Sequence, residues 1–326
     1  MAASKLSLSQ SSFNFSSSDS FLLNVSYPNY IYFSNGIVYS LKKPTLFTFF
    51  SSNASTNIKR SSAQSKSNSL CYTRLFQKEQ IIILVCLDGT PPAYAYSEGF
   101  GDGSTNWLVF LETNKLTFRG GRIYNAVMEE LLDKGMRNAQ NAILTGMSAG
   151  GLSTILHCDR FRALFPNTIR VKCISDSGFF IRGRHFAQVI AANGLGALLP
   201  KSCTSKRDPS LCLFAEYLVE DVATPLFIVE SAFDTYQIKS NFILTVPDFG
   251  PIFKKTLMKL DKSSSRGIFL DSCYLHTHIL QRYNWMTSPV LQNRTVREAI
   301  GDWFYDRSTF QEIDSLNLYP QSCTPK

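Results

Sequence analysis

The chain has 326 residues, 44% of them hydrophobic, which is enough to bury a sizeable core in one large domain or two small ones. Its net charge is +8, but the basic residues form no run of five or more and no nucleic-acid-binding motif is present. This pattern argues against a nucleic-acid partner. The charge fits an acidic polysaccharide or a solvated basic surface.

The N-terminal region differs in composition from the rest of the chain. Residues 1–70 contain 20 serines and a single acidic residue, Asp19. We predict that residues 1–80 form a disordered region and that residues 81–326 form the folded domain. No apolar run near the start is long enough for the core of a signal peptide. The serine-rich, acid-poor composition resembles an organellar transit peptide.

The longest aliphatic run covers residues 81–87 and predicts a buried strand, since it is far too short to span a membrane. The glycines within residues 99–103 lack the spacing and the following helix of a dinucleotide-binding fingerprint. We interpret that second segment as a loop.

From about residue 106 the sequence alternates between strand-like and helix-like segments. Residues 122–136 place Ile123, Val127 and Leu131 on one face of a helix that ends near Gly135. Short apolar segments predict strands at 107–111, 142–145, 171–175, 225–230 and 267–270. This alternation indicates an α/β fold with a mostly parallel sheet and helices on both faces.

Residues 146–150 read Gly-Met-Ser-Ala-Gly and match the pattern G-x-S-x-G. A strand-like segment precedes them, and a helix-like segment, 151–157, follows. A strand, a sharp turn and a helix form a nucleophile elbow, in which the glycines permit the turn and expose the hydroxyl of Ser148. The pattern therefore predicts a nucleophilic serine.

Such a serine needs a histidine as base. The chain has four histidines. His157 lies on the helix after Ser148 and is expected to point away from the turn, and His185 precedes any late strand. The base is therefore His276 or His278, which follow a late strand. Their spacing also suits a pair of metal ligands, but no third ligand lies nearby in the sequence.

The base in turn needs a carboxylate that orients it, and two aspartates compete for this role. Asp234 follows the strand at 225–230, and loops after the carboxyl ends of strands hold the functional groups of such folds. Asp176 is the alternative, although it is also suited to capping a following helix. Asp271 lies too close to the histidines in sequence to be favoured.

Eight cysteines are present, and no pair has the C-x-x-C spacing of a zinc or redox site. Cys203 and Cys212 flank a polar loop. We predict that they form a disulfide, which points to an oxidising compartment.

Further motifs occur between about residues 85 and 315. They begin at Cys86 (CLDGTPPAY), Asn106 (NWLVFLE), Phe118 (FRGGRI), Gly146 (GMSAGGL), Ile155 (ILHCDRFRAL), Ser231 (SAFDTYQI), Asp271 (DSCYLH) and Gly301 (GDWFYDR). In sequence and in order, these motifs resemble those of the plant pectin acetylesterases, which are related to the animal Notum carboxylesterases.

The resemblance implies a single α/β-hydrolase-like domain that hydrolyses acetyl esters of pectin. It makes Ser148 the nucleophile, Asp234 the orienting acid and His276, rather than His278, the base. The backbone N–H of Ala149 is then a donor of the oxyanion hole. The reaction needs no metal or organic cofactor. The resemblance further implies acetylated pectin as the partner and secretion to the cell wall, and we expect a monomer.

The chain departs from the family pattern after Glu112. In the family, a Gly-Gly-Gly-Trp-Cys segment and several dozen further residues precede the motif that here begins at Phe118. That block supplies a donor of the oxyanion hole and one wall of the substrate groove. A second family segment is shortened around residues 241–264. One alternative hypothesis is therefore a catalytically impaired or inactive relative. Another is a carboxylesterase that acts on acylated proteins, as Notum does, although the plant-type motifs argue against it.

Overall fold

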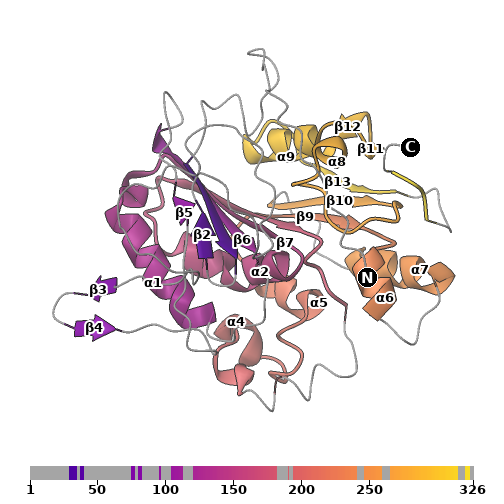
Figure 1. The fold of residues 1–326 in the computed structure, drawn as a ribbon. Coiled ribbons are helices and arrows are strands. Elements are labelled where there is room, and N and C mark those ends of the chain that lie inside the picture. Colours follow the sequence, from indigo (N-terminus) through magenta and orange to yellow (C-terminus); the bar gives the residue numbers. More distant parts are fainter. Residues whose placement is uncertain are drawn as a thin grey trace, which may run out of the picture.

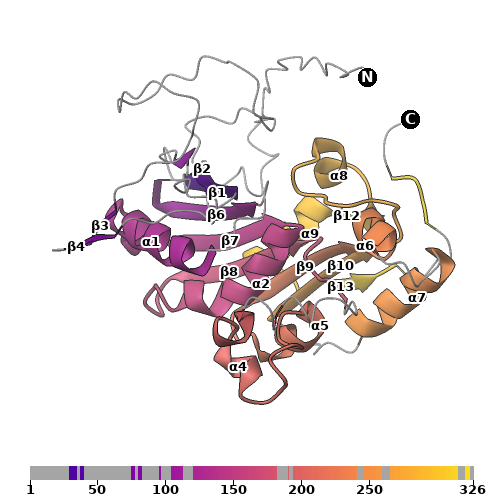
Figure 2. The same ribbon diagram turned by 60° about the horizontal axis from the view of Figure 1, so that its bottom comes forward.

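The computed structural model describes residues 29–34, 37–39, 75–77, 80–82, 95–96, 104–112, 120–181, 190, 194–240, 246–258, 265–314 and 320–323. Within these residues, the main sheet has nine strands, and its central strands are all parallel to their neighbours (Figures 1 and 2). From one edge inward they are β13 (Gln311–Ile313), β10 (Arg266–Asp271), β9 (Leu226–Ser231), β8 (Arg170–Asp176), β7 (Asn141–Met147) and β6 (Asn106–Glu112). The predicted parallel α/β sheet is confirmed.

Residues from the N-terminal region complete the sheet. Strand β1 (Asn29–Ser34) lies parallel to β6, and β2 (Ile37–Tyr39) and β5 (Ala95–Tyr96) pair with β1 in antiparallel orientation. The expectation of disorder over residues 1–80 did not include these two strands, and for the region as a whole it stays a prediction. The domain boundary at residue 80 stays a prediction.

The strand predicted at residues 81–87 also differs from the structure. Residues Gln80–Ile82 form β4, which pairs with β3 (Leu75–Gln77) in a separate two-stranded hairpin. Residues 83–87 lie outside the described residues, as does the glycine-rich loop at 99–103.

Helices cover both faces of the sheet, as predicted, because the strand side chains alternate between two cores. On β6, Trp107, Val109 and Leu111 belong to one core, and Leu108 and Phe110 belong to the other. The first core packs against α1 (Gly120–Asp133), α2 (Ala149–Arg162), α5 (Ala215–Leu218) and α7 (Val246–Leu257). The second packs against α8 (Arg282–Met286) and α9 (Val296–Phe304), on the opposite side in Figure 1.

The remaining elements are short. They are the helices α4 (Lys201–Thr204) and α6 (Thr235–Ser240) and the strands β11 (Val290–Leu291) and β12 (Arg294–Thr295). The described helices include none with both the length and the apolar character that crossing a membrane requires.

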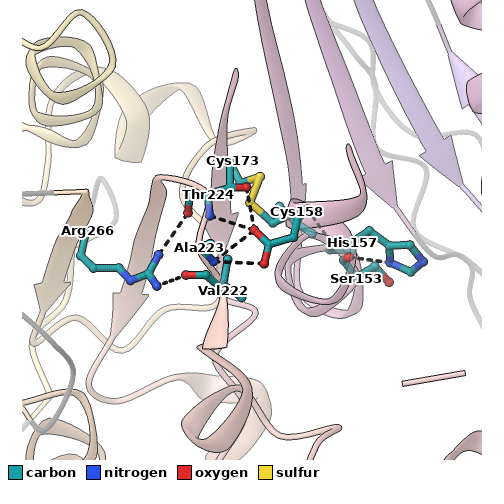
Figure 3. The surroundings of a disulfide bond; sticks show 11 residues. Ser153, His157, Cys158, Cys173, Val222, Ala223, Thr224 and Arg266 are labelled. Atoms are coloured by element: carbon teal, nitrogen blue, oxygen red, sulfur yellow. Dashed lines mark hydrogen bonds between the residues drawn. A yellow bond between two sulfur atoms is a disulfide. The ribbon is translucent and has the colours of Figure 1, made fainter. Parts of the chain in front are cut away.

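Three disulfides lie within the described residues. The predicted Cys203–Cys212 bond is present. Two others join Cys158 to Cys173 and Cys273 to Cys323, whose partners lie 15 and 50 residues apart, and the sequence analysis did not predict them. The Cys158–Cys173 bond links α2 to β8 (Figure 3).

The residue after Cys158 strengthens this link. The carboxylate of Asp159 accepts hydrogen bonds from the backbone N–H groups of Ala223 and Thr224, just before β9. Carbonyl groups of the same loop accept hydrogen bonds from the guanidinium of Arg266 at the start of β10 (Figure 3). Helix α2, which begins directly after Ser148, is thus tied to three strands of the sheet.

We expect the double replacement Cys158→Ala and Cys173→Ala to lower the free energy of unfolding by about 3 kcal/mol, because a cross-link over 15 residues restricts the unfolded chain. Denaturant unfolding of both proteins checks this. Reductant should destabilise the parent protein at least as much as this double replacement does. Equal unfolding midpoints for parent and variant would contradict the prediction.

Candidate active site

Ser148 occupies a sharp turn between β7 and α2. Its backbone has φ 55° and ψ −125°, a conformation that costs a residue with a side chain free energy and is typical of functional turns. The neighbouring glycines make the turn possible, because a Cβ on Gly146 would lie 2.5 Å from the carbonyl oxygen of Gly150. The predicted nucleophile elbow is therefore present, and Ser148 lies at its tip.

Ser148, His276 and Asp234 lie within hydrogen-bonding distance of one another, in that order. Nε2 of His276 lies 2.8 Å from Oγ of Ser148, and Nδ1 lies 2.6 Å from Oδ2 of Asp234. The three residues follow β7, β10 and β9, whose carboxyl ends meet at one edge of the sheet. A carboxylate only accepts hydrogen bonds, so Nδ1 carries a proton and Nε2 is free to accept the hydroxyl proton of Ser148.

The surroundings of this array restrict both the acid and the base. Asp234 is fully buried, and its Oδ1 accepts a hydrogen bond of 2.8 Å from the backbone N–H of Gln237. The imidazole of His276 is 19% exposed. The ring of Tyr236 stacks against it at 5.3 Å between centroids. The imidazole of His276 is therefore partly accessible to solvent, and the ring of Tyr236 covers one of its faces.

A second carboxyl group, that of Glu230, lies buried behind the array. Burial and the nearby charge of Asp234 raise the pKa of Glu230 well above its ordinary value, so this side chain is a neutral acid. Its Oε1 accepts a hydrogen bond of 2.5 Å from the backbone N–H of Phe179. The sequence analysis did not single out Glu230, since a glutamate at the end of a strand carries no motif.

The alternative acid and base, Asp176 and His278, contact each other rather than Ser148. Oδ1 of Asp176 lies 3.0 Å from Nδ1 of His278, and both side chains are fully buried. Oδ2 of Asp176 accepts hydrogen bonds from the backbone N–H groups of His278 and Ile279, each 2.8 Å long. The interpretation of Asp176 as a helix cap is therefore wrong, because its carboxylate binds the loop that follows β10.

Of the two remaining histidines, His157 does not belong to this array. His157 lies on α2, donates a hydrogen bond from Nδ1–H to the carbonyl oxygen of Ser153, and packs against the ring of Tyr124. Burial lowers the pKa of His157 to about 4, so it is neutral. His185 lies outside the described residues.

The predicted oxyanion donor, Ala149, is the first residue of α2, where backbone N–H groups are not used within the helix. The structure places it next to Ser148 in an exposed position. Residues 113–119, where the sequence analysis expects the family block to be missing, lie outside the described residues, and so do residues 241–245 and 259–264 of the second shortened segment.

The sequence matches the family described as Pectinacetylesterase over residues 64–114, 112–248 and 241–325. Successive matches meet within this chain at two places, near residues 112–114 and 241–248, which is expected where the chain lacks a stretch of the family sequence. Both places agree with the breaks that the sequence analysis identified.

Individual relatives support the same assignment. Pectin acetylesterase 7 of Arabidopsis thaliana is 34% identical to this chain, over 71% of this chain and 86% of its own. Pectin acetylesterase 11 of the same plant is 32% identical, over 74% of this chain and 88% of its own. The first alignment spans 337 positions, more than the whole chain has, so segments of that relative have no counterpart here. Palmitoleoyl-protein carboxylesterase notum2 of Xenopus laevis is 28% identical over 59% of this chain and 44% of its own.

A solved structure shares the fold. The structure of the Wnt deacylase Notum from Drosophila has a TM-score of 0.53 and 24% identity, and the match covers 64% of this chain and 66% of that one. The α/β-hydrolase-like fold predicted from the sequence is therefore confirmed. The match over nearly all of residues 64–325, together with relatives above 30% identity, shows that this chain belongs to the pectinacetylesterase family.

Proposed function

We propose that this chain is a serine carboxylesterase that removes acetyl groups from pectin, with Ser148, His276 and Asp234 as its catalytic residues. The observation that carries the proposal is the continuous hydrogen-bonded array from Ser148 through His276 to Asp234 at the tip of a nucleophile elbow. Relatives named pectin acetylesterases over most of the chain supply the substrate class.

In the proposed reaction, Oγ of Ser148 attacks the acetyl carbonyl carbon while Nε2 of His276 takes the hydroxyl proton. The proton then passes to the leaving sugar oxygen, and an acetyl-enzyme remains. Water, deprotonated by the same Nε2, attacks this ester, and the proton then passes to Oγ of Ser148 as the ester bond breaks and acetate is released. Asp234 accepts the Nδ1 proton in a hydrogen bond throughout, which stabilises the imidazolium when it forms.

The backbone N–H of Ala149 is the proposed donor to the oxyanion of each tetrahedral intermediate. It lies at the N-terminus of α2, where the helix dipole also favours negative charge.

Acetylated pectin fits the charge of the chain. Pectin is a polyanion, and the net charge of +8 favours the approach of such a polymer. The three disulfides suit an oxidising compartment, as expected for a protein secreted to the cell wall. We propose that the protein works there as a monomer and without a metal or organic cofactor.

The second candidate is a catalytically impaired relative, and the missing stretch after Glu112 favours it. In that case the array is intact but the second donor to the oxyanion is absent. Loss of one such donor lowers the rate by about 10²–10³-fold, which leaves a weak but measurable enzyme.

The test is the release of acetate from acetylated pectin by the purified chain, with Ser148→Ala as the matched control. We expect activity that the control lacks, with a loss of kcat approaching about 10⁶-fold for a full-strength triad. An acylated peptide is the second substrate, because a preference for it would favour the function named for the Notum relatives. A folded parent protein with no activity on either substrate would overturn the proposal.

A further inference from the structure

We propose that His278 is a positioning residue, which acts through Asp176 and Asp271 to fix the loops that carry the catalytic array. The inference rests on the proposed function, because it concerns how His276 is held. His278 does not touch Ser148 or Asp234; it lies two residues beyond the base, in the same loop.

The contacts of His278 identify its protonation state. Its Nδ1 lies 3.0 Å from Oδ1 of Asp176, and its Nε2 lies 2.8 Å from Oδ2 of Asp271. Two carboxylates need two N–H donors, so the ring is an imidazolium. Burial favours the neutral ring, but the charges and hydrogen bonds of Asp271 and Asp176 outweigh it and raise the pKa of His278 to about 10.

The two carboxylates connect the imidazolium to the base and to the nucleophile. Asp176 binds the backbone of His278 and Ile279 through its carboxylate. Its own carbonyl oxygen accepts a hydrogen bond of 2.8 Å from the backbone N–H of Ser148. The neighbouring Ser177 holds the backbone N–H of Thr277 with its hydroxyl group. The nucleophile turn and the base loop are thus joined through one short segment.

Asp271 connects the imidazolium to the acid. Its carbonyl oxygen accepts a hydrogen bond of 2.7 Å from the backbone N–H of Ala232, two residues before Asp234. Its carboxylate accepts a hydrogen bond of 2.9 Å from the hydroxyl group of Ser231, which also lies 3.3 Å from Nε2 of His278. All three catalytic segments therefore meet at the ion cluster of Asp176, His278 and Asp271.

A buried cation near the base also has an electrostatic effect. The ionisable groups facing His278 are Asp176 on β8, Asp271 on β10 and the neutral Glu230 on β9. His276 itself faces Asp234 and Tyr236. If the charge of His278 is removed, the two carboxylates are left unbalanced, and the protonated form of His276 is favoured.

The pH dependence of kcat/KM therefore distinguishes this electrostatic effect from a purely structural role, which would leave the profile at the same pH. His276 acts as a base only when neutral, so activity rises with pH through its pKa. In His278→Gln, we expect the acidic limb of the kcat/KM profile to move to higher pH by roughly half a unit or more. We also expect kcat to fall about tenfold or more, because the loop shifts, while KM changes little.

Two matched variants separate the effect of the charge of His278 from the effect of replacing a buried side chain. His278→Lys keeps a buried cation between the carboxylates, so its acidic limb should stay close to that of the parent protein even where kcat falls. Glu230→Gln replaces a neutral acid by a neutral amide in the same buried layer, so it should leave the limb in place. A limb that does not move in a folded His278→Gln variant would overturn the proposal.

A measurement on the parent protein needs no variant. The chain has only four histidines, so ¹⁵N-labelled histidine gives few signals. At pH 8 we expect one of them to carry protons on both ring nitrogens, and a neutral His278 at that pH would overturn the proposal. The pKa of His276 can be read from the same spectra. The inference is thus tested even if the chain releases no acetate, and the two failures are distinguishable.

Discussion

Replacement of Asp234 by asparagine is expected to lower kcat for acetate release by about four orders of magnitude, with KM nearly unchanged. The amide of an asparagine would face Nδ1 of His276, at a site where the carboxylate now lies 2.6 Å away. An N–H there forces the imidazole proton onto Nε2, which is then unable to accept the proton of Ser148. The protein should stay folded, because asparagine has nearly the shape of aspartate and its amide oxygen can still accept the hydrogen bond from the backbone N–H of Gln237.

The matched control is Asp176→Asn, which changes the other buried aspartate that the sequence left as a candidate. Its carboxylate accepts three hydrogen bonds from the base loop, and an asparagine has only one oxygen for them. We therefore expect a loss of about 1–3 kcal/mol in the free energy of unfolding and a smaller loss of kcat than in Asp234→Asn. Steady-state kinetics and denaturant unfolding of both variants decide. A larger loss of kcat in Asp176→Asn than in Asp234→Asn would mean that Asp176, and not Asp234, is the acid that orients the base.

The sheet was predictable because its strands are buried on both faces and therefore appear as continuous apolar runs. The strand predicted at 171–175 is β8, at Arg170–Asp176, and the one predicted at 267–270 is β10, at Arg266–Asp271. Strand β1 was missed because the surrounding serines dominate the composition of its region. A six-residue strand is too short to outweigh that average.

The candidate site divides in the same way. The flanking glycines indicate Ser148 in the sequence, and the positions after late strands indicate Asp234 and His276. The structure brings these three side chains together. The role of Asp176 was not predictable, because the loop it binds lies about a hundred residues further along the chain. Nor does sequence spacing reveal that His278 is an ion held between two carboxylates. Such pairings depend on which strands are neighbours, which only the folded sheet determines.

Restoring the block that the family carries after Glu112 is expected to raise kcat by about 10²–10³-fold, because we propose that this block supplies a second donor to the oxyanion. The graft takes the segment of pectin acetylesterase 7 between the positions that align with Glu112 and Phe118 and inserts it at that place in this chain. The donor acts on charge that develops only in the transition state, so kcat should rise more than the affinity for substrate.

Two controls show whether the gain comes from the donor. A glycine-serine insert of equal length supplies no ordered donor and should give no gain. The same graft in a Ser148→Ala background should remain inactive, because the oxyanion forms only after attack by the serine. Sequencing of transcripts across codons 112–118 adds independent information, since an extra exon there would mean that the natural protein already carries the block. An unchanged kcat in a folded grafted protein would mean that Ala149 and groups already present in this chain stabilise the oxyanion without the block. The hypothesis of an impaired relative would then lose its physical basis.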